Sequence, residues 1–146
     1  IVSVASNKNW TYNSTEKCME INGYSADVAS EDWFVTKQIS LVNLSEASLQ
    51  FRSWTKYTDV GFQFPMKVFI SIDYENDGKP NSAIWHELPA ILPIAHSATW
   101  TSSGIINLDN YIGKSVYIAF KYVSSGATSS TASNWKIDDV QIKGKN

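Results

Sequence analysis

Apolar and polar side chains alternate along several segments of this chain, and this alternation limits the fold more than any other feature. The clearest segment is 115–123. Its predicted inward-facing residues are Val116, Ile118, Phe120 and Tyr122. Such alternation is typical of β-strands, because successive side chains of a strand point to opposite faces. No stretch repeats apolar positions at helical spacing without Gly, Pro or β-branched clusters between them. The sequence therefore predicts an all-β fold.

Further alternating segments are separated by turn residues such as Asn22-Gly23 and Ser124-Ser125-Gly126. Besides 115–123, strands are predicted at 2–5, 17–22, 32–41, 48–54, 66–72, 83–88, 99–108 and 134–143. Many short strands at this spacing indicate a β-sandwich or barrel. A length of 146 residues suits one domain, which we expect to span residues 1–146.

Charge and composition exclude several classes of protein. The net charge is −2 with both signs interspersed, so no basic cluster is dense enough to bind nucleic acid. No apolar run approaches the ~20 residues that cross a bilayer, so we expect no transmembrane segment in this chain. The lone Cys18 permits no internal disulfide, and its strand-like surroundings predict a small buried hydrophobe. The abrupt start at Ile1 suggests a mature protein or a piece of a longer one.

The last predicted strand contains a change of phase. Trp135 and Ile137 share one phase, whereas Val140 and Ile142 share the other. A strand changes phase by inserting a residue, so we expect a β-bulge between them. The residues at the change of phase are Asp138 and Asp139. Adjacent carboxylates inside a strand are unfavourable, so backbone N–H groups, a lysine or a bound cation should compensate them.

A calcium site is one hypothesis for those carboxylates. Calcium takes six to eight oxygen ligands, typically including several carboxylates. Early and late strands of a sandwich are often neighbours, so Asp138 and Asp139 could lie beside Glu31 and Asp32. The predicted ligands are Glu31, Asp32, Asp138 and Asp139. The alternative is that Glu31 and Asp32 cap a turn and that the late pair binds Lys136 or backbone.

Catalytic motifs are weak. Residues 73–78 match half of an EF-hand loop, but Ile84 stands where the bidentate Glu is needed, so an acidic turn is the better interpretation. His86 and His96 fit no metal-ligand pattern. No G-x-S-x-G elbow occurs, and no carboxylate pair stands out as that of a glycosidase. We therefore expect a protein that is not an enzyme.

Aromatic residues are the remaining binding candidates. Residues 55–65 form a predicted long loop that is unusually aromatic. Exposed rings in and around it could stack on sugars, or they could anchor the loop in the core. The candidate ligand-binding residues are Trp54, Tyr57, Phe62 and Phe64, and a second possible platform is Trp10 with Tyr12.

Several segments together resemble the cleaved-adhesin or choice-of-anchor J family. They are Glu31-Asp32-Trp33-Phe34-Val35-Thr36, Trp85-His86-Glu87-Leu88, the segment 100–108, the segment 111–122, and Trp135-Lys136-Ile137-Asp138-Asp139-Val140-Gln141-Ile142. Their order and spacing hold over about residues 16–143. The resemblance implies a two-sheet antiparallel β-sandwich with jelly-roll topology, at the bacterial cell surface, outside the cell or at the outer membrane. Such domains often belong to a larger lipoprotein, protease or adhesin.

The resemblance also implies calcium in some members, which would place the ion near Asp32 and the Asp138–Asp139 pair. It does not fix a ligand, since one fold supports many functions. The leading hypothesis is a non-catalytic extracellular adhesion or binding module, with a structural Ca²⁺ ion, for a host or microbial surface glycan or protein. The alternative is a carbohydrate-binding module attached to a glycan-degrading or glycan-capturing surface system.

Overall fold

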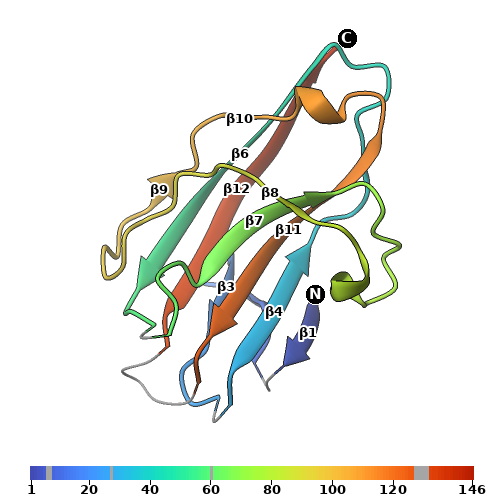
Figure 1. The fold of residues 1–146 in the computed structure, drawn as a ribbon. Helices are drawn as coiled ribbons and strands as arrows, with labels where there is room; N and C mark the ends of the chain where they lie inside the picture. Colours follow the sequence, from blue (N-terminus) through green and yellow to red (C-terminus); the bar gives the residue numbers. More distant parts are fainter. Residues whose placement is uncertain (6–7, 27, 60, 127–131) are drawn as a thin grey trace.

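The alternating segments form two six-stranded antiparallel sheets that pack face to face, as the computed structural model shows (Figure 1). The structure describes residues 1–5, 8–26, 28–59, 61–126 and 132–146. The prediction of an all-β, two-sheet sandwich with jelly-roll topology is confirmed. No helix in these residues is long and apolar enough to span a membrane.

The front sheet in Figure 1, sheet A, has the strand order β1-β4-β11-β7-β8, and β5 pairs with β11 at the side of this path. Its strands are β1 (Val2–Ala5), β4 (Ser30–Val35), β5 (Ile39–Ser40), β7 (Met66–Ser71), β8 (His86–Glu87) and β11 (Ser115–Ser124). The central strand is β11, which pairs with β4 on one side and β7 on the other.

The sheet behind it, sheet B, has the order β10-β6-β12-β3-β2, with β9 pairing with β6. Its strands are β2 (Thr11–Asn13), β3 (Cys18–Asn22), β6 (Glu46–Lys56), β9 (Thr101–Ser102), β10 (Ile106–Asn107) and β12 (Asn134–Lys145). Here the central strand is β12, which lies between β6 and β3.

One hydrophobic core fills the space between the sheets. The inward residues predicted for 115–123 are all buried in it. Phe120 of β11 contacts Phe51 of β6 edge-to-face, with ring centroids 5.0 Å apart. Aromatic pairs in this geometry add to the free energy of burial, so this contact helps to hold the two sheets together.

The outer face of sheet A is covered by residues 72–85, which include the 3-10 helix η1 (Pro80–Ser82). Trp85 packs against both Trp33 and Tyr74, with ring centroids 5.3 Å away in each case. Asp73 fixes the start of this segment by accepting hydrogen bonds from the Ser71 hydroxyl (2.7 Å) and the Ile84 N–H (3.0 Å). The acidic stretch predicted as a turn therefore secures a cover over sheet A.

Some predicted strands differ in extent. The segment predicted at 32–41 divides into β4 and β5, and the one at 99–108 divides into β9 and β10, followed by the 3-10 helix η2 (Asp109–Tyr111). β7 ends at Ser71, so Ile72 is exposed and not in the core. The strand β2 was not predicted. Cys18 is buried as expected, and burial raises the pKa of its thiol.

Candidate functional site

The predicted metal ligands on β4 point to opposite faces of sheet A, as neighbours in a strand must. Glu31 lies on the outer face, where it accepts a hydrogen bond from Trp33 Nε1 (3.0 Å) and pairs with Lys121 Nζ (3.3 Å). Burial raises the pKa of Glu31, but the Trp33 hydrogen bond and the Lys121 charge outweigh it, so the pKa lies below its ordinary value. Asp32 lies opposite Tyr122 and is buried on the inner face.

The late carboxylates lie at the predicted β-bulge, which the structure confirms. Asp138 pairs with Arg52, and regular pairing resumes at Gln141 and Gln50. Asp139 adopts a left-handed backbone with φ 52°. Arg52 compensates both charges, with Nη2 2.9 Å from Asp138 Oδ2 and Nε 2.7 Å from Asp139 Oδ2.

The early and late carboxylates therefore do not meet. Within the described residues, no three His, Cys, Asp or Glu side chains gather in a way that could hold a metal ion. The prediction that Glu31 and Asp32 lie beside Asp138 and Asp139 is wrong, because Glu31 and Asp138 lie on the outer faces of opposite sheets, which stack ~10 Å apart. Calcium binding itself stays a prediction.

The aromatic loop, in contrast, forms a hollow of about 360 Å³ at one end of the sandwich. Of the predicted ligand-binding residues, three line it and are exposed: Tyr57 (44%), Phe62 (40%) and Phe64 (58%). The opposite wall is apolar and consists of Leu92, Pro93, Ile94 and Ala95. Aromatic and aliphatic walls with few polar groups are typical of ligand pockets.

Hydrogen bonds fix both walls of this hollow to the sandwich. Asp59, which is buried, accepts hydrogen bonds from the Gly61 N–H (2.9 Å), the Ser125 N–H (3.0 Å) and the Ser125 hydroxyl (2.6 Å). The Ala98 N–H donates to the Thr55 carbonyl (3.0 Å) and ties the opposite wall to the end of β6. The hollow is therefore largely formed before a ligand arrives.

Two aromatic residues at its rim have a left-handed backbone. Tyr57 has φ 67° and His96 has φ 61°, a left-handed region that is costly for side chains of this size. The two rings contact each other edge-to-face at 6.5 Å, and Lys56 Nζ lies 5.2 Å from the Tyr57 ring centroid. Strained residues often cluster at binding sites, and here they hold Tyr57 in an exposed position.

The remaining aromatic candidates lie elsewhere. Trp54 projects from the outer face of sheet B, where Lys136 Nζ lies 4.3 Å from its ring centroid. Trp10 is buried and donates from Nε1 to the Asp32 carbonyl, so it belongs to the core. Tyr12 is exposed on β2. The structure thus separates Trp54 from the other three predicted residues.

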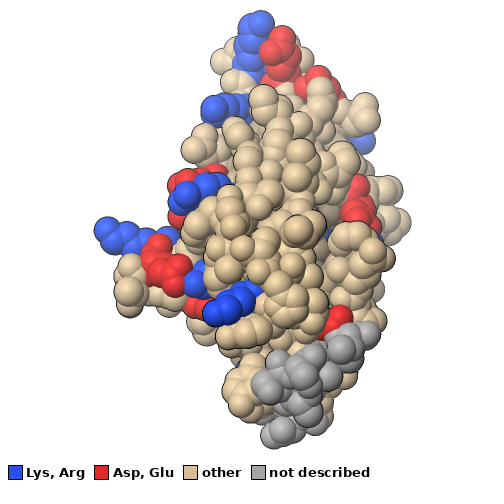
Figure 2. Space-filling view, turned by 90° about the vertical axis from the view of Figure 1, so that its left-hand side faces the viewer, with Lys and Arg blue, Asp and Glu red and all other residues tan. Residues whose placement is uncertain are grey.

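Sequence reasoning missed the wall at 92–95, although a signal was present. Residues 88–108 contain no Asp, Glu, Lys or Arg, and the isoleucines at 91, 94 and 105 are exposed. Figure 2 looks onto this side of the molecule, where the charged side chains lie mostly toward the margins. Extended uncharged surface of this kind often marks an interaction site.

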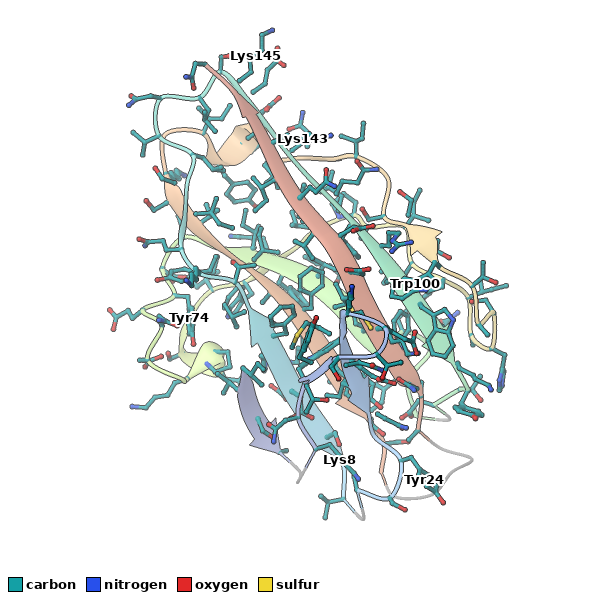
Figure 3. The ribbon with its side chains drawn as sticks, turned by 180° about the vertical axis from the view of Figure 1, so that it is seen from behind. Lys8, Tyr24, Tyr74, Trp100, Lys143 and Lys145 are labelled. Carbon is teal, nitrogen blue, oxygen red and sulfur yellow. The ribbon has the colours of Figure 1, made fainter. Side chains whose placement is uncertain are left out.

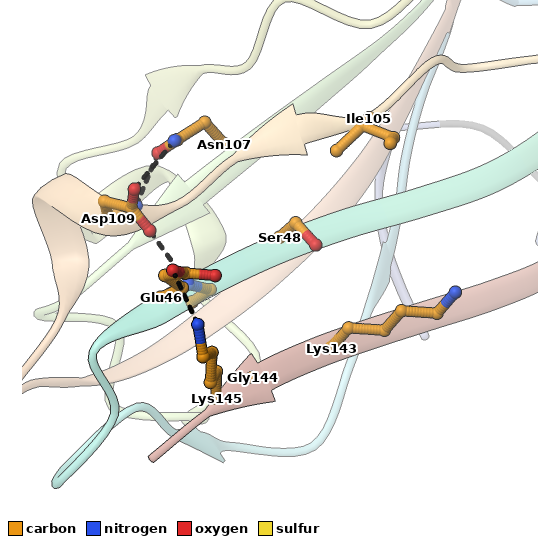
Figure 4. A pocket seen from close by; sticks show the side chains of 9 residues that line it. Glu46, Ser48, Ile105, Asn107, Asp109, Lys143, Gly144 and Lys145 are labelled. Atoms are coloured by element: carbon orange, nitrogen blue, oxygen red, sulfur yellow. Dashed lines mark hydrogen bonds and ion pairs between the residues drawn. The ribbon is translucent and has the colours of Figure 1, made fainter.

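A larger hollow, of about 460 Å³, lies at the other end of β6 and β12 (Figure 4). Its carboxylates already have partners: Asp109 accepts hydrogen bonds from the Ala47 N–H and the Asn107 amide, each at 2.8 Å, and Glu46 pairs with Lys145 at 3.3 Å. The Ala47 hydrogen bond is the main cause of a lowered Asp109 pKa. These contacts join β6 to the η2 turn and to β12, so this hollow is less suited to a ligand.

Comparison with known proteins gives matches of two kinds. The model of a family described as "Domain of unknown function (DUF5017)" matches residues 3–146. The K1 cleaved adhesin domain of Lys-gingipain from Porphyromonas gingivalis W83 has a similar structure, with 15% identity, a TM-score of 0.61, and coverage of 100% of this chain and 89% of that one. The K3 cleaved adhesin domain of the same protein matches with 16% identity, a TM-score of 0.55, and coverage of 94% and 86%. No curated protein matches significantly in sequence. The expected resemblance to cleaved adhesins is thus confirmed for the fold.

Proposed function

This chain belongs to the family described as a domain of unknown function (DUF5017), and on that premise we propose that it is a non-catalytic binding module that acts in adhesion outside the cell. The observation that carries the proposal is the hollow of about 360 Å³ between the aromatic loop and residues 92–95, which we call the loop-end hollow. The rings of Tyr57, Phe62 and Phe64 are exposed in it. Exposed aromatic side chains held in a preformed concave surface suit binding, because little entropy is lost when a partner docks. The adhesin domains that share this fold support the same interpretation.

The chemistry of the hollow favours binding over catalysis. Asp59 is the carboxylate in its lining, and its oxygens already accept hydrogen bonds from Gly61 and Ser125. A general acid or base must instead reach a substrate proton. The ligand we expect is an uncharged, largely apolar group on a host or microbial surface protein. The segment 88–108, which includes the wall at 92–95, contains no Asp, Glu, Lys or Arg.

A surface glycan is the second candidate partner, and the exposed Tyr57 ring favours it. Aromatic rings offer an apolar face to sugars, but a sugar also needs polar groups around that face. In this hollow, several of them are engaged: the Thr55 hydroxyl donates to the Asn134 carbonyl, and the Ser133 hydroxyl accepts from Trp135 Nε1. A protein partner therefore fits the hollow better.

An adhesion assay tests both proposals. Beads that carry the domain are applied to mammalian or bacterial cells, which are untreated, treated with protease, or oxidised with periodate to destroy glycans. We expect the Phe62→Ser/Phe64→Ser variant to lose adhesion, and protease but not periodate to remove it. Ile84→Ser is the matched control, because Ile84 is an exposed apolar residue of the cover on sheet A. If the double variant adheres like the unmodified domain, the hollow is not the binding site.

A further inference from the structure

A third hollow lies beside the bulge in β12, on the outer face of sheet B. Regular pairing stops after Asp138–Arg52 and resumes at Gln141–Gln50, so Asp139 and Val140 together lie opposite the single residue Phe51. Bulges bend a strand and change the direction of a side chain, and they are frequent beside functional sites. This hollow has a volume of about 290 Å³.

The lining of this hollow is polar and varied. Beside Phe51, it contains two amides, a hydroxyl, a guanidinium and a carboxylate, contributed by Gln50, Gln141, Ser102, Arg52 and Asp139. The Gln50 amide donates a long hydrogen bond (3.5 Å) to the Ser102 hydroxyl, which a ligand could replace. Donors and acceptors thus stand side by side. Because Arg52 is ion-paired with Asp138 and Asp139, the opposite charges largely compensate each other, which disfavours a strongly charged ligand.

Aromatic surface lies next to these polar groups. The Arg52 guanidinium lies 4.9 Å from the centroid of the Trp100 ring, a cation–π contact that holds the ring in place. Figure 3 shows Trp100 against β6 on the side of sheet B. Trp54 follows Ser53 on β6, and Ser53 pairs with Thr101, the residue after Trp100. Both rings are half-buried, so part of each stays accessible.

We infer that this hollow binds the ring of a neutral saccharide. Its hydroxyls would exchange hydrogen bonds with the Gln50 and Gln141 amides and with the Asp139 carboxylate, while its C–H face lies along Trp100. Charge-assisted hydrogen bonds to Asp139 and Arg52 would be the strongest of these contacts. The site is separate from the loop-end hollow and does not depend on the adhesion proposal.

The inference is tested by screening the domain on a microarray of neutral glycans and titrating the best binder by calorimetry. Trp100→Ala should weaken binding at least tenfold, and Gln141→Ala several-fold. Gln141 is exposed, so its replacement should leave folding intact, which a melting curve checks for both variants. Gln38→Ala is the matched control, an exposed glutamine outside the strands, and should bind like the unmodified domain.

Two outcomes would overturn the inference. One is that no neutral glycan on the array binds the domain. The other is that binding survives in Trp100→Ala and Gln141→Ala but is lost in Phe62→Ser/Phe64→Ser, which would assign the saccharide to the loop-end hollow. The adhesion assay depends on the Phe62→Ser/Phe64→Ser variant and the glycan titration on Trp100→Ala and Gln141→Ala, so either proposal can fail while the other stands.

Discussion

Replacement of Asp59 by alanine should release the aromatic loop from the sandwich. The carboxylate of Asp59 accepts three hydrogen bonds, from Gly61 and from the backbone and hydroxyl of Ser125, at 2.6–3.0 Å. Hydrogen bonds to a charged group contribute about 1.5–3 kcal/mol each. Since water can replace some of the lost partners in a surface loop, we expect Asp59→Ala to lower the free energy of unfolding by about 2–4 kcal/mol.

For a domain of this size, such a loss lowers Tm by about 5–10 °C. Asp59→Asn keeps the shape and one acceptor oxygen, so it should lose about half as much. Hydrogen exchange gives the local measure: the amides of Gly61 and Ser125 should exchange faster in Asp59→Ala, because local opening exposes them. Adhesion through the loop-end hollow should fall with them.

Asp77→Ala serves as the control, because Asp77 is exposed and accepts a backbone hydrogen bond from Lys79 in a turn far from the hollow. It should cost less than about 1 kcal/mol. The reasoning is refuted if Asp59→Ala melts within about 1 °C of the unmodified domain and its Gly61 and Ser125 amides stay protected. In that case, other contacts hold the loop.

Three further predictions concern stability. Gly23→Ala should lower the free energy of unfolding by about 1–3 kcal/mol, because its Cβ would lie 2.4 Å from the Tyr122 hydroxyl. In chemical denaturation, the double variant with Tyr122→Phe should recover part of this loss, whereas strictly additive effects of the two substitutions would contradict the clash. Folding lowers the pKa of Glu31, so the unfolded state binds the proton first as the pH falls, and stability should decrease as the pH drops through and below the ordinary carboxyl range. In melting curves between pH 6 and 3, Glu31→Gln should make this decrease smaller. An unchanged dependence of Tm on pH would exclude Glu31 as its cause. If the domain binds calcium, saturating Ca²⁺ should raise Tm by several degrees over EDTA, since a ligand at 100 times its Kd adds about 2.7 kcal/mol. Asp139→Asn should remove the difference, and identical melting curves with Ca²⁺ and with EDTA would contradict the prediction.

Long alternating segments were predictable from sequence because their burial follows from the strand period alone. The inner face of 115–123 and the bulge near Asp138 are both of this kind. Strands of two residues, such as β8, β9 and β10, are too short to show a period and depend on pairing with distant neighbours. The strand period also fails for Val140. This residue shares the phase of Ile142 in the sequence, yet it is exposed because it lies within the bulge.

The binding candidates were predictable as residue types but not as groups. The exposed loop rings Tyr57, Phe62 and Phe64 were found from their local density, and the structure brings them together in one hollow. The partner of Asp138 and Asp139 was not found, because Arg52 stands 86 residues before Asp138 in the chain and becomes a neighbour through sheet pairing. The separation of Glu31 from Asp32, in contrast, follows from strand alternation and could have been anticipated.

The position of β11 and β12 at the centre of their sheets has a consequence for the biosynthesis of the domain. Until residues 115–145 have left the ribosome, β4 has no link to β7, and β6 has none to β3. The nascent chain can then form little more than isolated hairpins and edge pairs, which are at best marginally stable in water. The core must therefore assemble late and through contacts between distant residues, which makes folding slow.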